Sequence, residues 1–170
     1  MGELSDDAMA ALRRLRSVLP EADILVVGAT ALARHIPFDY RTSDDLDLVL
    51  GVDLDGFRQA ADELADWHRT EGAAEHRFHT DRGLQLDLVP AGEELRARGF
   101  VPWAEGFEMN LLGFDLAFAH AERVTLEAGL DVLFPPPAVI AQDQRLDGPA
   151  RAREGPPGSG PAHARLPGER

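Results

Sequence analysis

The amino-acid sequence predicts a single domain of the α/β (α+β) class. Short apolar segments suited to buried strands alternate with stretches whose apolar residues repeat at the helical period. The chain has 170 residues, 44% of them hydrophobic, which suffices for one ordinary core and leaves no room for a second full domain. We therefore expect an N-terminal helix within residues 1–20, a folded domain over residues 21–141 and a disordered tail over residues 142–170.

Composition argues against several classes of function. The formal net charge of −13 disfavours non-specific binding of DNA, because neutralising phosphates needs clustered cations. All 17 basic residues are arginine, which excludes covalent lysyl-nucleotide chemistry and a lysine-containing P-loop. Cysteine is absent, so disulfides, thiolate nucleophiles and cysteine-bound zinc are excluded as well. An acidic N-terminus and the lack of a membrane-length apolar run predict a cytoplasmic protein without a membrane partner.

The first part of the chain predicts two helices separated by a buried strand. Ser5 or Asp6 can cap a helix that ends at Pro20, and its three arginines are most simply a solvated face. Residues 23–30 are typical of a strand that runs through Gly28 into the next helix. Such a turn exposes backbone N–H groups that suit phosphate oxygens, although many α/β units have it for packing alone.

The segment that begins at Arg41 carries the strongest chemical signal. Asp45 and Asp47 flank Leu46 at the start of an apolar strand, so the two carboxylates share one face of it. Two such carboxylates repel each other unless a cation lies between them, and a divalent metal is the simplest candidate. Solvated turn residues are the alternative. Arg41 can orient the carboxylates or contact a triphosphate, and a plain surface ion pair is the alternative there.

A third acid lies inside a later strand. Residues 75–80 and 84–89 can pair as a hairpin, and Asp87 interrupts the apolar run of its second strand. A carboxylate in that setting is costly to bury unless it is paired or bound to metal; the alternative is an edge strand facing water. His76 and His79 are three residues apart and would face opposite sides of their strand, which argues against a shared metal.

The remaining segments complete the expected fold. Asp53 or Asp55 can cap a helix whose apolar stripe, which extends to Trp67, belongs to the core. Residues 91–108 are expected to form a polar loop. The last expected elements are a short helix over residues 113–121 and a hairpin of residues 123–127 with residues 130–134.

Together these segments resemble the nucleotidyltransferase superfamily that includes DNA polymerase beta. Its pattern is an apolar strand, a Gly-Gly or Gly-Ser turn, a helix, an acidic-apolar-acidic pair on the next strand and a third acid on a later one. The resemblance spans roughly residues 20–141, and Gly28-Ala29 departs from the usual turn. More narrowly, the chain resembles the AbiEii-type toxin nucleotidyltransferases at residues 27–29, 41–47, 86–90 and 112–121.

This resemblance implies a mixed sheet flanked by helices and a metal-dependent activity. The expected reaction moves a nucleoside monophosphate from a nucleoside triphosphate to a hydroxyl of RNA or protein. The expected cofactor is Mg²⁺, as two ions, and the expected partner is an antitoxin. An inactive or regulatory nucleotide-binding module and a globular interaction domain without catalysis are the alternatives. The implied site comprises the catalytic and metal-binding acids Asp45, Asp47 and Asp87 and the nucleotide-binding residues Gly28, Ala29, Thr30 and Arg41.

Residues 142–170 depart from the rest of the chain. They are dense in Gly, Pro and Arg and lack periodicity, a composition typical of disorder. The resembled family continues here with a Trp-x-Asp-Arg segment and a Lys-Asp-x-x-Asp-Leu helix, and permissible codons read one base later supply both. We therefore hypothesise a frameshift near residues 141 and 142, natural or introduced in the gene sequence, which would impair this copy. A genuine linker-like tail is the alternative, and an intact frame on resequencing the gene would refute the frameshift.

Overall fold

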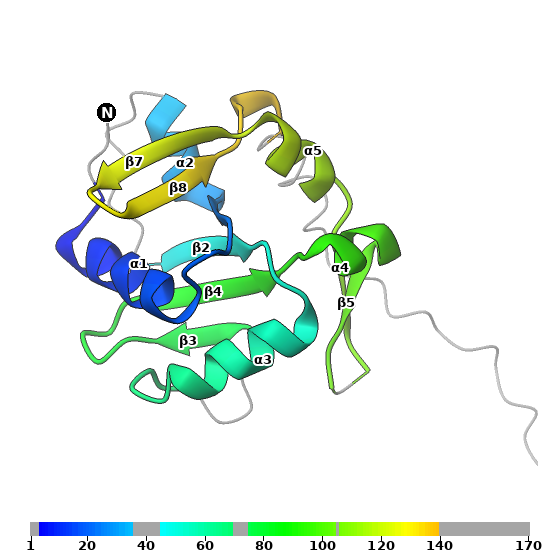
Figure 1. Ribbon diagram of the computed structural model, residues 1–170, viewed down its shortest axis with the longest axis horizontal. Coiled ribbons are helices and arrows are strands. Elements are labelled where there is room, and N and C mark those ends of the chain that lie inside the picture. Colours follow the sequence, from blue (N-terminus) through cyan, green and yellow to red (C-terminus); the bar gives the residue numbers. More distant parts are fainter. Residues whose placement is uncertain (1–3, 36–44, 70–74, 105, 140–170) are drawn as a thin grey trace, which may run out of the picture.

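The fold is built on one six-stranded mixed sheet with the strand order β3-β4-β2-β1-β8-β7 (Figure 1). The computed structural model describes residues 4–35, 45–69, 75–104 and 106–139. The pairs β2–β4 and β1–β8 are parallel, and the other neighbouring pairs are antiparallel. The expected α/β class with a mixed sheet is thus confirmed. In sheet order the strands are β3 (Arg77–His79), β4 (Gln85–Pro90), β2 (Asp45–Leu50), β1 (Ile24–Val26), β8 (Leu130–Phe134) and β7 (Glu122–Glu127).

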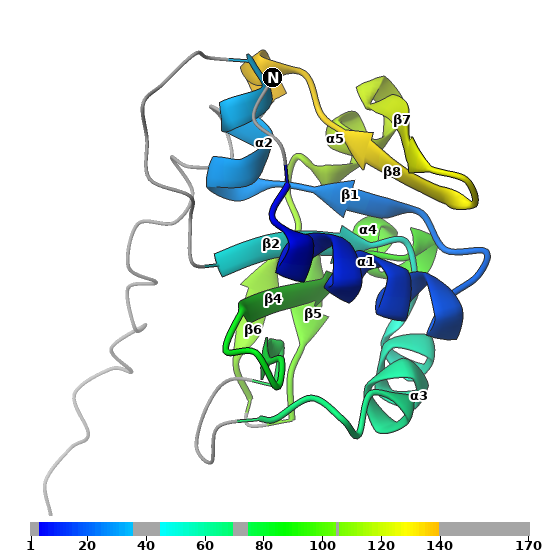
Figure 2. The same ribbon diagram turned by 90° about the vertical axis from the view of Figure 1, so that its left-hand side faces the viewer.

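Helices α1 and α3 cover one side of this sheet (Figures 1 and 2). The first begins as expected, because the Ser5 hydroxyl accepts a hydrogen bond from the N–H of Ala8 at 3.2 Å. No helix among the described residues is long and apolar enough to cross a membrane. The helices are α1 (Asp6–Val18), α2 (Gly28–His35), α3 (Leu54–Glu63), α4 (Glu93–Arg98) and α5 (Phe114–His120).

The core lies between these two helices and the central strands. Alternate residues of β2 and β4 are leucines whose side chains are at most 1% exposed. Fully burying each leucine contributes about 1.5–3 kcal/mol to folding. The buried leucines pair in register as Leu46 with Leu86 and Leu48 with Leu88. Because side chains alternate along a strand, this register turns the intervening residues to the opposite face.

Aromatic side chains extend the core toward the edge strand β3. The ring of Phe57 on α3 contacts those of Phe78 and Trp103 edge-on, at centroid distances of 6.4 and 5.6 Å. Trp67 lies beyond the end of α3, yet it remains buried and packs against Phe78. Trp67 and its neighbours therefore belong to the core, as the sequence predicts, and α3 itself stops four residues before it.

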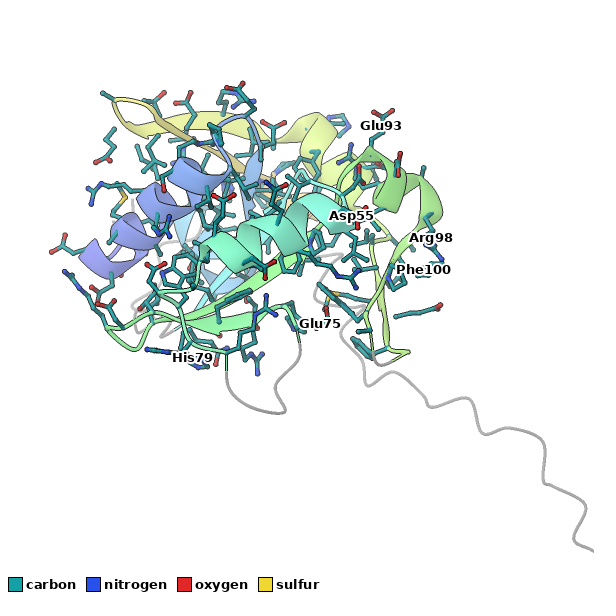
Figure 3. The ribbon with its side chains drawn as sticks, turned by 60° about the horizontal axis from the view of Figure 1, so that its bottom comes forward. Asp55, Glu75, His79, Glu93, Arg98 and Phe100 are labelled. Carbon is teal, nitrogen blue, oxygen red and sulfur yellow. The ribbon has the colours of Figure 1, made fainter. Side chains whose placement is uncertain are left out.

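The expectation of a polar loop over residues 91–108 is wrong. This segment contains α4 and a hairpin of β5 (Phe100–Pro102) with β6 (Glu108–Asn110). Gly99, at φ +87°, ends α4 in the left-handed conformation. Asp53 occupies the N-cap position of α3, but its carboxylate accepts the N–H of Leu95 at 3.2 Å and so caps α4. Figure 3 shows Arg98 beside Phe100 next to this hairpin, with its guanidinium 4.6 Å from the ring centroid.

The arginines of α1 do more than face solvent. The exposed Arg13 forms a bidentate ion pair with Glu127, with N–O distances of 2.6 and 2.8 Å. Arg16 donates hydrogen bonds to the carbonyls of Leu19, Pro20, Ala22 and Asp131. It thereby ties the end of α1 to β8, so the expectation of a purely solvated arginine face is wrong for this residue.

Candidate active site

The parallel pairing of β2 with β4 brings the expected catalytic acids together. Asp47 lies directly opposite Asp87, and Asp45 lies opposite Gln85. Neighbouring strands are about 5 Å apart, so the three carboxylates share one small area on the face opposite the leucine core. Since β4 lies between β3 and β2, Asp87 is not on an edge strand, and the alternative of an edge facing water is wrong.

The residue opposite Asp87 on the other side is Arg77 of β3. Its Nε donates to Oδ1 of Asp87 at 2.8 Å and its Nη2 donates to Oδ2 at 2.7 Å. The hydrogen bond to Asp87 raises the pKa of Arg77 above its usual value, and the charges of Asp47 and Asp45 act in the same direction. Sequence reasoning missed this residue. The signal was present in the hairpin, because its pairing register places Arg77 across from Asp87.

Gly28 forms the other flank of the acids. Its backbone is in the left-handed region at φ +65°, and an added Cβ would overlap the Asp47 carboxylate and lie 3.0 Å from its Cγ. The adjoining Val27 N–H donates to the carbonyl oxygen of Asp47 at 3.0 Å. Only glycine therefore fits where the β1–α2 turn meets the acid.

The start of α2 follows this glycine directly. Ala29 is exposed and Thr30 is half-buried in the first helical turn. The first N–H groups of any α-helix have no partner within the helix, and they favour anions. The expected phosphate-contacting residues thus begin at the point where Gly28 meets Asp47. Arg41, the remaining expected site residue, lies outside the described residues, as do residues 142–170.

The donor set suits a hard divalent cation, because carboxylate oxygens are the ligands that Mg²⁺ prefers. The described residues include no group of three or more acids or histidines arranged to hold a metal ion. Asp45 and Asp47 have further interactions of their own, and both oxygens of Asp87 accept hydrogen bonds from Arg77. The residues present therefore fit a metal in the chemistry of their oxygen donors, while the described residues do not converge as a metal site and an arginine holds the third acid.

The two histidines near the site lie in different surroundings. His76 packs against Trp103 with ring centroids 5.7 Å apart, and its Nδ1 is buried without a hydrogen-bond partner in the described part of the chain. Burial lowers the pKa of this imidazole, and the charge of Asp87 opposes that shift. His79 lies on the edge strand opposite Gln85 (Figure 3).

Comparisons with known proteins identify a matching family and two solved structures of low similarity. Residues 10–158 match the family described as nucleotidyl transferase AbiEii toxin, type IV TA system, a wider span than residues 20–141. The antibiotic-resistance factor ANT(2'')-Ia is structurally similar, with a TM-score of 0.49 and 17% identity over 82% of this chain and 71% of that one. A nucleotidyltransferase-like protein from Paracoccidioides brasiliensis gives 0.49 and 16% over 85% and 68%. No curated protein sequence matches the chain.

Proposed function

The chain belongs to the AbiEii family of nucleotidyltransferase toxins, and we propose that it transfers a nucleoside monophosphate from a nucleoside triphosphate to a hydroxyl group of RNA or protein. We further propose that it is the toxin half of a toxin–antitoxin pair. The observation that carries the proposed chemistry is the row of neighbours formed by Gly28, Asp47 and Asp87. This row places a helix start suited to phosphates beside two carboxylates suited to a metal ion.

In the proposed reaction the oxygen of the acceptor hydroxyl attacks the α-phosphorus of the triphosphate. The bond from that phosphorus to the bridging oxygen breaks, and pyrophosphate leaves. Asp45 and Asp47 would hold Mg²⁺, and Asp87 would share a second ion and accept the proton of the attacking hydroxyl. When bound, the divalent cations supply charge neutralisation at the phosphates.

The triphosphate would lie against the start of α2. Backbone N–H groups from Gly28 to Thr30 would donate hydrogen bonds to its β- and γ-phosphates, and the Thr30 hydroxyl is a further donor. The missing side chain at residue 28 leaves the Asp47 carboxylate in its place beside this turn. Arg41 would contact the same phosphates through its guanidinium.

A second candidate is a nucleotide-binding module without turnover. The composition of residues 142–170 favours it, because those residues lack the Lys-Asp-x-x-Asp-Leu segment of the resembled family. Such a module would bind Mg²⁺ and a triphosphate and would transfer nothing. A globular interaction domain with merely solvated acids would bind neither.

Thermal unfolding with each nucleoside triphosphate, with and without Mg²⁺, tests the proposed binding site. A ligand at 100 times its Kd stabilises the native state by about 2.7 kcal/mol, which is several degrees for a domain of this size. We expect a Mg²⁺-dependent shift with the donor triphosphate that Asp47→Asn abolishes. Asp62→Asn is the matched control, since it removes the same charge from an exposed position on α3. Equal shifts in both variants would contradict the site.

Transfer of the labelled donor to an acceptor then separates the enzyme from the inactive module. We expect Asp47→Asn and Asp87→Asn each to lower the rate by about 1,000-fold, which corresponds to about 4 kcal/mol of lost transition-state stabilisation. Asp47→Asn should fold normally or be slightly more stable, because it relieves repulsion between like charges. Asp87→Asn also loses its ion pair with Arg77. Full activity in either variant would refute the assignment of the acids.

A further inference from the structure

The ion pair of Arg77 with Asp87 occupies the acid that the proposed reaction needs. We propose that Arg77 is a positioning residue that serves as a resident counter-cation for Asp87 and the neighbouring acids and yields Asp87 when a divalent metal binds there. This inference rests on the proposed function and adds a residue that the expected site did not contain. It makes a metal ion and a guanidinium competitors for one carboxylate.

The geometry of the pair carries the first step. Both oxygens of Asp87 accept hydrogen bonds from one guanidinium, at 2.8 and 2.7 Å, so the carboxylate presents its bidentate edge to Arg77. A metal ion can reach the remaining lone pairs only, unless the pair opens. The side chain of Arg77 is 42% exposed, whereas that of Asp87 is 18% exposed. Arg77 is therefore the partner that can move into solvent.

The local charge carries the second step. Arg77 interacts electrostatically with Asp87, Asp47 and Asp45, and all three favour its charged form. Arg77 supplies one positive charge beside these carboxylates. Without Arg77 the surroundings of these acids would lose one positive charge, and the acids would attract a cation more strongly. Arg77 thus stabilises the metal-free protein and weakens its affinity for metal.

A second arginine in the chain provides a matched control. Arg13 pairs with Glu127 through the same two donor atoms, Nε and Nη2, at 2.6 and 2.8 Å. It lies on α1, and replacing it with glutamine changes the net charge by the same amount as replacing Arg77. A comparison of Arg77→Gln with Arg13→Gln therefore removes the effects of net charge and of losing any bidentate pair.

The experiment titrates the full chain with Mn²⁺ in the absence of nucleotide, with calorimetry and thermal unfolding as readouts. We expect Arg77→Gln to melt below the wild type without metal and to bind Mn²⁺ about tenfold more tightly, because one positive charge is removed beside the ion. Arg13→Gln should leave the Mn²⁺ affinity within about twofold of the wild type, since it lies away from the acids. A merely structural ion pair would lower the melting temperature and leave the affinity unchanged.

Two more variants keep the inference testable. Arg77→Lys retains the charge and loses the planar fork, so it should tighten Mn²⁺ binding less than Arg77→Gln, and it replaces that variant if glutamine prevents folding. In an Asp87→Asn background, Arg77→Gln should tighten binding much less, because its main partner is gone. If Arg77→Gln binds Mn²⁺ no more tightly than Arg13→Gln, the inference is overturned. The proposed function would survive that result as long as the Mg²⁺-dependent triphosphate shift is present and sensitive to Asp47→Asn.

Discussion

The two faces of strands β2 and β4 result from the same pairing register and have different roles. On the face covered by α1 and α3, leucines pair with leucines and are at most 1% exposed. On the other face Asp47 lies opposite Asp87, so the register brings two like charges onto neighbouring positions. A single pairing register therefore holds the fold together on one side and concentrates charge on the other. The proposed site is a consequence of the core that lies behind it.

The two faces also differ in what completes them. The leucine face needs only the alternation of its own strands and a helix to cover it. The acidic face depends on Gly28, which comes 19 positions before Asp47, and on Arg77, which comes 10 positions before Asp87. Changes on the first face should therefore affect stability, and changes on the second should affect ligand binding.

The largest effect on stability is expected on the leucine face. Leu88→Ala removes a side chain that is 1% exposed and should lower the free energy of unfolding by about 2–5 kcal/mol through lost burial and a residual cavity. Gln85→Ala, three positions earlier on the acidic face, should change it by about 0.5 kcal/mol or less. Chemical denaturation of both variants measures the difference. Similar losses in the two would mean that the faces are not divided in this way.

An intermediate effect is expected where Gly28 meets Asp47. Gly28→Ala should lower the free energy of unfolding by about 1–2 kcal/mol because a Cβ is placed at positive φ. The overlap of that Cβ with the Asp47 carboxylate should lower it further. It should also abolish the Mg²⁺-dependent triphosphate shift.

Gly129→Ala is the control for this change. Gly129 also has a positive φ, of +81°, but an added Cβ there would have no neighbour within 4 Å. That variant should lose stability and retain the triphosphate shift. If the Gly28→Ala protein keeps the Mg²⁺-dependent triphosphate shift, Gly28 is not part of the proposed binding site.

Much of this arrangement was predictable from the sequence, because period-2 alternation fixes a strand's faces without knowledge of its neighbours. Asp45 and Asp47 were assigned to one face this way, Gly28 followed from the strand-to-helix turn and Asp87 from an acid inside an apolar strand. The structure places Gly28, Asp47 and Asp87 side by side. Arg77 was missed because its role emerges only when the two strands of the expected hairpin are paired residue by residue, which places it opposite Asp87. Helix α4 was missed although Glu93 and Glu94 in its first turn and Gly99 at its end are typical helix signals. Short elements of this kind are set by tertiary contacts, here the cap from Asp53.

The smallest effect is expected at the edge of the core, where His76 places a titratable group against Trp103. Burial lowers the pKa of His76 below its ordinary 6.5, so the unfolded chain takes up the proton first as the pH falls. Above pH 6.5 the ring is neutral in the folded and the unfolded chain, so it adds no pH dependence to stability. As the pH falls below 6.5 and through the lower folded pKa, the wild type should lose stability.

His76→Phe, which keeps an aromatic ring against Trp103 and cannot titrate, should lack that loss. His120→Gln, at an exposed helix end, should behave like the wild type. Denaturant unfolding at pH 7.5 and at lower pH measures how the free energy of unfolding of each of the three proteins changes with pH. If the free energy of unfolding changes with pH equally in the wild type and in His76→Phe, protonation of His76 does not affect the stability of the leucine-lined side of the sheet. In that case charge would affect the acidic face only, although the burial of His76 predicts an effect on the leucine face as well.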